Sequence, residues 1–131
     1  MATLLEDLIE WIIDAGHATV AGVDIFENYE PEMPNKCIML HSYDSVLSTD
    51  KGNEASLRFV QVVARDTGSS GAQQLAQQLF ELFFRPDEEI TDLPNNRWAL
   101  VFPRQVPFKL KEDHERRVYW VFNVSITTNI N

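Results

Sequence analysis

The 131-residue sequence contains a single cysteine, Cys37, and this scarcity limits its chemistry. One thiol can form neither an internal disulfide nor a thiolate metal cluster, so we expect a chain that works in a reducing compartment. Residues 1–16 lack the basic leader of a signal peptide, and acidic residues interrupt their apolar positions. No apolar run approaches the length that spans a membrane, so we expect no membrane association.

Lysine and arginine are absent from residues 1–35, and this absence makes the charge of the chain uneven. The acids of this stretch are Glu6, Asp7, Glu10, Asp14, Asp24, Glu27, Glu30 and Glu32. The remaining twelve acids nearly balance the eleven bases, so almost all of the net charge of −9 lies in the first quarter. Such a surface repels phosphate backbones, which argues against nucleic-acid binding. It indicates a solvated face, a docking face for a basic partner, or a wall past which DNA slides.

No recognisable catalytic or metal-binding spacing is present. His17, His41 and His114 are far apart and fit no zinc motif. Cys37 begins a predicted strand and is interpreted as a structural thiol. The run at 113–117, DHERR, has the composition of a catalytic cluster, but it stands in a polar connector and predicts a solvated hairpin tip. We therefore expect no catalytic residue, cofactor or metal.

The segment RFVQVVARDTGSSGAQQLAQQLF contains Asp66-Thr67-Gly68, the tripeptide of aspartic proteases. Those enzymes need two such loops that share one proton, whereas here an amphipathic helix follows at once. A phosphate-binding loop needs a lysine that this stretch lacks. We interpret the segment as a corner between a strand and a helix, in which Gly68 and Gly71 permit the turn and Ser70 caps the helix. A hydrolase built on Asp66 is the less favoured alternative.

Periodicity predicts two helices and five strands. A capping box formed by Thr3 and Glu6 begins the first helix, and Gly16 ends it. Its apolar arc covers roughly 200°, wider than a surface helix needs, so we infer contact with two layers, the second being the rest of the domain or a neighbouring subunit. The second helix is predicted at 72–84. The predicted strands are 23–26, 37–41, 57–65, 98–102 and 118–127, and residues 43–56 are predicted to form a polar loop.

This order of elements predicts a single domain, 1–131, of the α+β class: a mixed, mainly antiparallel β-sheet with two helices packed on one face. Five segments then carry a resemblance. They are LLEDLIEWI, which ends before a glycine; VDIFENYEPEMPNKCIMLHSYD; LRFVQVVAR, which ends in Arg65; GAQQLAQQLFELF; and PFKLKEDHERRVYWVFNVSI. In their order along the chain and in their residue patterns, they resemble the small tail-terminator and minor capsid proteins that join the head and tail of long-tailed bacteriophages.

The resemblance implies a non-enzymatic, hexameric ring that caps the growing tail tube and joins it to the head, with DNA passing through its lumen. The implied partners are copies of the same chain, the tail tube protein and a head-completion protein. The implied location is the virion, and the host cytoplasm during assembly. The alternative is a monomeric or dimeric adaptor that holds one protein partner by a sheet edge or by the glutamine-rich side of the second helix.

The charge asymmetry motivates a hypothesis about the subunit interface. The acidic N-terminal helix of one subunit would pair with arginines of the next subunit in the ring, or would face the lumen. The residues proposed for the interface or lumen are Glu6, Glu10, Trp11, Asp14, Arg97, Arg104, Arg116 and Arg117.

Overall fold

The computed structural model describes residues 3–47, 55–84 and 90–129 of the chain. The elements are α1 (Leu4–Asp14), β1 (Ile25–Glu27), β2 (Cys37–Leu47), β3 (Ala55–Asp66), α2 (Ser69–Phe83), β4 (Thr91–Leu93), β5 (Arg97–Pro103), β6 (Phe108–Glu112) and β7 (Val118–Asn129). Each predicted helix and strand has a counterpart among them. The short strands β4 and β6 were not predicted, because three and five residues give too few alternations to detect.

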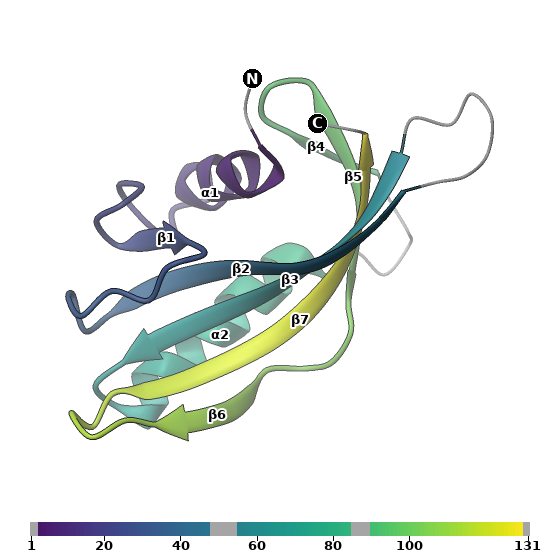
Figure 1. The fold of residues 1–131 in the computed structure, drawn as a ribbon. Helices are drawn as coiled ribbons and strands as arrows, with labels where there is room; N and C mark the ends of the chain where they lie inside the picture. Colours follow the sequence, from purple (N-terminus) through teal and green to yellow (C-terminus); the bar gives the residue numbers. More distant parts are fainter. Residues whose placement is uncertain (1–2, 48–54, 85–89, 130–131) are drawn as a thin grey trace.

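The strands form one curved sheet in the order β1-β2-β3-β7-β5-β4, and β6 pairs with β7 beside this path (Figure 1). β1 runs parallel to β2, and the other described pairs are antiparallel. The long strand β7 has β3 on one side along its whole length. On its other side it pairs with β6 near Val118–Val121 and with β5 near Val124–Thr128. The α+β class with a mixed, mainly antiparallel sheet is therefore confirmed.

Both helices pack on the same face of the sheet. Alternate residues of the central strands β3 and β7 point to that face and form one cluster with the apolar side chains of α1 and α2. The strand residues in this cluster include Val60, Val62, Ala64, Phe122, Val124 and Ile126. The intervening residues point to the opposite face, where a smaller cluster of Phe26, Cys37, Met39, Val63, Tyr119 and Val121 covers only part of the sheet. We call this second side the open face.

The caps predicted for the first helix are confirmed. Thr3 Oγ1 accepts from Glu6 N, and Glu6 Oε1 accepts from Thr3 N, each at 3.2 Å. At the other end Gly16 has a φ of 87°, and the amides of Gly16 and His17 donate to Ile13 O and Ile12 O. These bonds satisfy carbonyls that the end of the helix leaves without partners.

The wide apolar arc of α1 is used within the subunit. Its buried residues are Leu4, Leu5, Leu8, Ile9 and Ile12. Trp11 adds a second direction of contact, because its ring meets the ring of Phe83 in α2 edge-on, with centroids 5.2 Å apart. α1 also contacts β1 and β4. The helix therefore does touch two layers, and both belong to its own domain.

The polar loop predicted at 43–56 is shorter in the structure. β2 continues to Leu47, and β3 begins at Ala55. A bulge between Ser42 and Asp44 interrupts the pairing without ending it. This part of the hairpin was not predicted because many of its residues are polar. Strands were predicted from alternating apolar and polar residues, which requires apolar residues on one side of the strand. The turn signal at 50–53 lies outside the described residues.

Candidate functional site

The Asp66 corner is built by close packing. Asp66 ends β3, and its Oδ1 accepts from Thr67 N at 2.7 Å. Its other carboxylate oxygen lies over the first turn of α2, where a Cβ on Gly71 would stand only 2.6 Å from Asp66 Oδ2. Gly71 is therefore required for this close approach and not for a left-handed turn.

The predicted cap of the second helix was wrong. α2 begins at Ser69, and Gly68 occupies the N-cap position without any side-chain capping bond. Ser70 lies inside the first turn of the helix. The helix therefore begins three residues before the predicted start at residue 72. The Asp66 carboxylate accepts from the amide and the hydroxyl of Thr67, within its own corner, which is the arrangement of a strand-to-helix connection.

Arg97, one of the proposed interface residues, lies inside the subunit. Its Nε is 2.7 Å from Asp7 Oδ2, and both side chains are 2% exposed. Arg97 Nη1 also donates to Thr128 Oγ1 at 3.2 Å and to Asn129 O at 3.1 Å. Asn95 Nδ2 donates to the second oxygen of Asp7 at 2.6 Å. This buried pair ties α1 to the edge of the sheet, so Arg97 is not a surface residue that a neighbour can reach.

Arg117 is also used internally, in the turn between β6 and β7. Its Nε donates to Asp113 Oδ2 at 2.8 Å, and its Nη1 donates to the carbonyl of Glu32. Burial raises the pKa of Asp113, but hydrogen bonds from Arg117, from the amide of Glu115 and from the hydroxyl of Tyr119 outweigh it and hold that pKa well below its ordinary value. The solvated hairpin tip predicted at 113–117 is therefore limited to residues 114–116, which are exposed. Asp113 and Arg117, at its two ends, pair with each other.

Arg65 is a second buried arginine that holds the connection between β1 and β2. We call residues 31–35 of this connection the proline-rich segment; it includes Glu32, whose carbonyl Arg117 binds. Arg65 is fully buried at the end of β3 and donates to the carbonyls of Pro31 at 2.7 Å, Pro34 at 2.7 Å and Asn35 at 3.1 Å. Its guanidinium lies 5.7 Å from the ring centroid of Tyr119. Together with Arg117, it fixes the connection between β1 and β2 across the open face. Sequence reasoning assigned no structural role to either contact.

The other proposed residues lie at separate places on the surface. Glu6, Glu10 and Asp14 are exposed on α1. Arg104 is exposed just beyond β5, where its Nη1 donates to Ser125 Oγ at 3.1 Å. Arg116 is exposed in the turn between β6 and β7. No acidic residue of α1 therefore meets Arg104 or Arg116 within the described part of one subunit.

Two of the exposed acids of α1, Glu6 and Glu10, line a groove, which we call the acidic groove. It has a volume of about 480 Å³ and is lined by Glu6, Ile9, Glu10, Ile13, Ala21, Glu27 and Asn95. Its floor is apolar, and its charged lining residues are three glutamates without a described lysine or arginine among them. Glu6 and Glu10 are four residues apart on one helix, so their like charges repel. The groove is therefore suited to a ligand that is both apolar and cationic.

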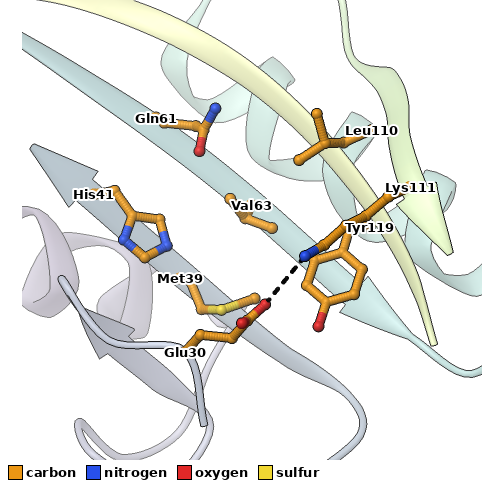
Figure 2. Close-up of a pocket in the computed structure, with 8 residues that line it drawn as sticks. All are labelled: Glu30, Met39, His41, Gln61, Val63, Leu110, Lys111 and Tyr119. Carbon is orange, nitrogen blue, oxygen red and sulfur yellow. Dashed lines mark ion pairs between the residues drawn. The ribbon is translucent and has the colours of Figure 1, made fainter. Parts of the chain in front are cut away.

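A smaller pocket lies on the open face, where residues from β2, β3, β6 and β7 converge with Glu30 (Figure 2). Its volume is about 200 Å³, below the range of roughly 300–1,000 Å³ that holds small-molecule ligands. Lys111 Nζ closes one side, 3.8 Å from Glu30 Oε1 and 4.6 Å from the ring centroid of Tyr119. The pocket can receive one side chain of a partner more readily than a cofactor.

Burial shifts the pKa values of two reactive side chains on this side of the sheet. Burial raises the pKa of the Cys37 thiol, which keeps it in its unreactive protonated form. Burial lowers the pKa of His41, which keeps the imidazole neutral at pH 7. Among residues 3–47, 55–84 and 90–129, no three histidine, cysteine or acidic side chains gather closely enough to hold a metal ion. None of the described helices is both long and apolar enough to cross a membrane.

Comparison with protein families gives one match. The family profile described as "Bacteriophage tail terminator protein" matches residues 12–130, which is almost the whole chain. It includes the sheet, α2 and both arginines that hold the proline-rich segment. No curated protein sequence matches the chain. Because the family profile covers far more than half of the sequence, the chain belongs to the bacteriophage tail terminator family.

Proposed function

We propose that this protein closes the end of the phage tail tube as a ring of six copies, with a lumen through which DNA passes. The family match over residues 12–130 carries the proposal, because it assigns the chain a structural role in the virion. Ring formation, the number of copies and the lumen extend that role. The protein would act in the virion, after assembling in the host cytoplasm.

The charge of the chain supports a conduit for DNA. The net charge is −9, and the first lysine or arginine in the sequence is Lys36. A lumen rich in basic residues would hold the duplex, since each neutralised phosphate adds affinity. An acidic wall instead lets DNA move past without specific binding. Under this proposal the protein shows no measurable affinity for double-stranded DNA even at low salt, where electrostatic attraction is strongest.

The proposed partners are copies of the chain, the tail tube protein and a head-completion protein. The proposed role needs no covalent chemistry, and two observations support a non-enzymatic protein. Asp66 is occupied by a hydrogen bond within its own corner. Burial also keeps the Cys37 thiol protonated. Cleavage of a peptide substrate at mildly acidic pH that is abolished by Asp66→Asn would favour the hydrolase alternative instead.

The proposal is tested by the growth of tail tubes in vitro. Purified protein is added to polymerising tube protein, and tube length is measured by electron microscopy. Termination predicts that tubes stop growing when the protein is present in small molar ratio to tube subunits. An adaptor that binds as a monomer or dimer along the tube predicts binding in proportion to tube length, without arrest of growth.

A further inference from the structure

We propose that the β6 edge of one copy docks into the acidic groove of the next copy, so that the subunits associate head to tail. This inference rests on the proposed function, because it supplies the contact that would build the ring. We call the exposed segment from Val106 to Lys111 the basic edge. It includes most of β6, which pairs with β7 on one side only.

Among the residues that the structure describes, no lysine or arginine lines the acidic groove. Its three glutamates surround a floor made by Ile9, Ile13 and Ala21. Two hydrogen bonds reach its glutamates, from Thr3 N to Glu6 Oε1 at 3.2 Å and from Asn95 Nδ2 to Glu10 Oε2 at 3.5 Å, and both leave the negative charge in place. A cationic ligand would relieve the repulsion along α1, and an apolar one would cover the floor. The occupant should therefore combine both properties.

The basic edge combines both properties in consecutive residues. Every residue of β6 is exposed. The apolar side chains of Val106, Phe108 and Leu110 are 67%, 38% and 48% exposed, and lysines follow the last two of them. The sequence FKLK therefore presents two large apolar groups and two positive charges within one short strand. Its chemistry is the complement of the acidic groove.

Lys111 has two contacts in its own subunit, with the carboxylate of Glu30 and with the ring of Tyr119, whose centroid lies 4.6 Å from Nζ. Its Nζ is 3.8 Å from Glu30 Oε1, and the two side chains are half exposed. An exposed pair of this kind contributes little to stability and can be exchanged for another carboxylate. Lys109 lies opposite Trp120 in the β6–β7 ladder, and a bulge separates it from Lys111. The side chain of Lys109 is exposed. Both lysines are therefore available to an incoming carboxylate.

The two surfaces lie at opposite edges of the molecule. At this end of the sheet the strand order is β1-β2-β3-β7-β6, so the β1 edge beside the groove is four strands away from β6 (Figure 1). A contact between two different patches is heterologous, and it leaves one groove and one edge free on each new copy. Repetition closes a ring if the rotation per subunit permits, and otherwise builds an open filament. The placement of the patches therefore permits repeated head-to-tail association, which a ring requires.

Charge reversal tests this contact in the full-length protein. The groove variant is Glu10→Lys with Glu27→Lys, and the edge variant is Lys109→Glu with Lys111→Glu. Assembly on tail tubes is followed by analytical ultracentrifugation and electron microscopy, and thermal unfolding verifies that each variant is folded. We expect each variant alone to assemble at least about tenfold more weakly than the wild type, because like charges then face each other. The wild-type assembly should weaken as salt is raised.

Mixing gives the decisive result. A groove variant offers a basic groove and a basic edge, whereas an edge variant offers an acidic groove and an acidic edge. The two should therefore restore assembly when mixed in equal amounts, as alternating copies, and a chain that carries both reversals should assemble by itself. The matched controls are Lys36→Glu and Glu81→Lys, which change exposed charges outside both surfaces and should leave assembly unchanged.

Three negative outcomes separate a failure of the docking contact from a failure of the proposed function. If the wild type and both charge variants form the same rings on tubes, the ring stands and the docking contact is wrong, with the lysines serving only to keep the β6 edge from aggregating. If mixing the variants fails to restore assembly that each variant lost, the docking contact is also wrong. If the wild type forms no ring with tubes, the proposed function itself fails.

Discussion

Asp7 and Arg97 form a buried ion pair across ninety residues of sequence, with Arg97 Nε 2.7 Å from Asp7 Oδ2. The pair joins the first helix to β5 and the end of β7. Removing one partner leaves an unpaired charge in the core. We expect Asp7→Ala to lower the free energy of unfolding by about 3–5 kcal/mol, measured by urea denaturation. The double variant Asp7→Leu with Arg97→Met should recover much of this loss, and a larger loss in the double variant would contradict the account.

Arg65 supplies a second buried contact whose removal should be costly. Arg65→Met keeps an apolar stem but leaves the carbonyls of Pro31, Pro34 and Asn35 without their donor. Each unsatisfied buried group costs about 1–3 kcal/mol, so we expect a loss of at least about 2 kcal/mol in urea denaturation. Arg65→Lys should recover only part of it, because an ammonium group cannot reproduce the planar set of donors. Equal stability of the Met and Lys variants would show that the fork of donors is unimportant.

Gly71 and Asp66 should show coupled effects on stability. Glycine to alanine inside a helix normally stabilises by about 1 kcal/mol. At position 71 the new Cβ would meet Asp66 Oδ2 at 2.6 Å and force the carboxylate away from Thr67 N. We therefore expect Gly71→Ala alone to raise the free energy of unfolding by less than this amount. In an Asp66→Ala background, the same substitution should raise it by the full amount. Thermal unfolding of the four chains measures the coupling, and additive effects would exclude the close approach.

Asp113 should make stability depend on pH. Its pKa is lowered in the folded protein, so its contribution is fully present above the unfolded value of about 3.9 and is lost as pH falls through the folded value. We expect Asp113→Asn to be less stable than the wild type at pH 7. The difference should shrink as pH falls from about 5 toward 2. Asp92→Asn, at an exposed position of β4, is the matched control for the removal of one carboxylate.

The sequence predicted the parts of the fold that local patterns determine. Alternation along β3 and β7 gave the central strands, and the capping box of Thr3 and Glu6 located the start of α1 within a residue. The register between strands and the strand order were not accessible, because they depend on contacts far apart in sequence. β6 was not predicted because its five residues, FKLKE, are too few for their alternation to identify a strand, and the structure shows that all five are exposed.

The prediction of the site residues was limited by the same problem. Asp7 looks like any other acid on the polar side of α1, yet it is 1% exposed because Arg97 comes to it from another element. Arg117 likewise turns inward toward Asp113 and Glu32. Charge counting located the acidic N-terminal surface correctly, but it could not separate buried arginines from exposed ones. The lysines of β6 were not among the proposed interface residues, because charge counting does not show which bases are exposed.

The central claim is tested most directly by electron microscopy of tail tubes mixed with the purified protein. The account predicts an open-centred ring of six subunits at one end of each tube, with none along its sides. Tubes with bare ends, or protein bound along their length as single copies, would contradict it.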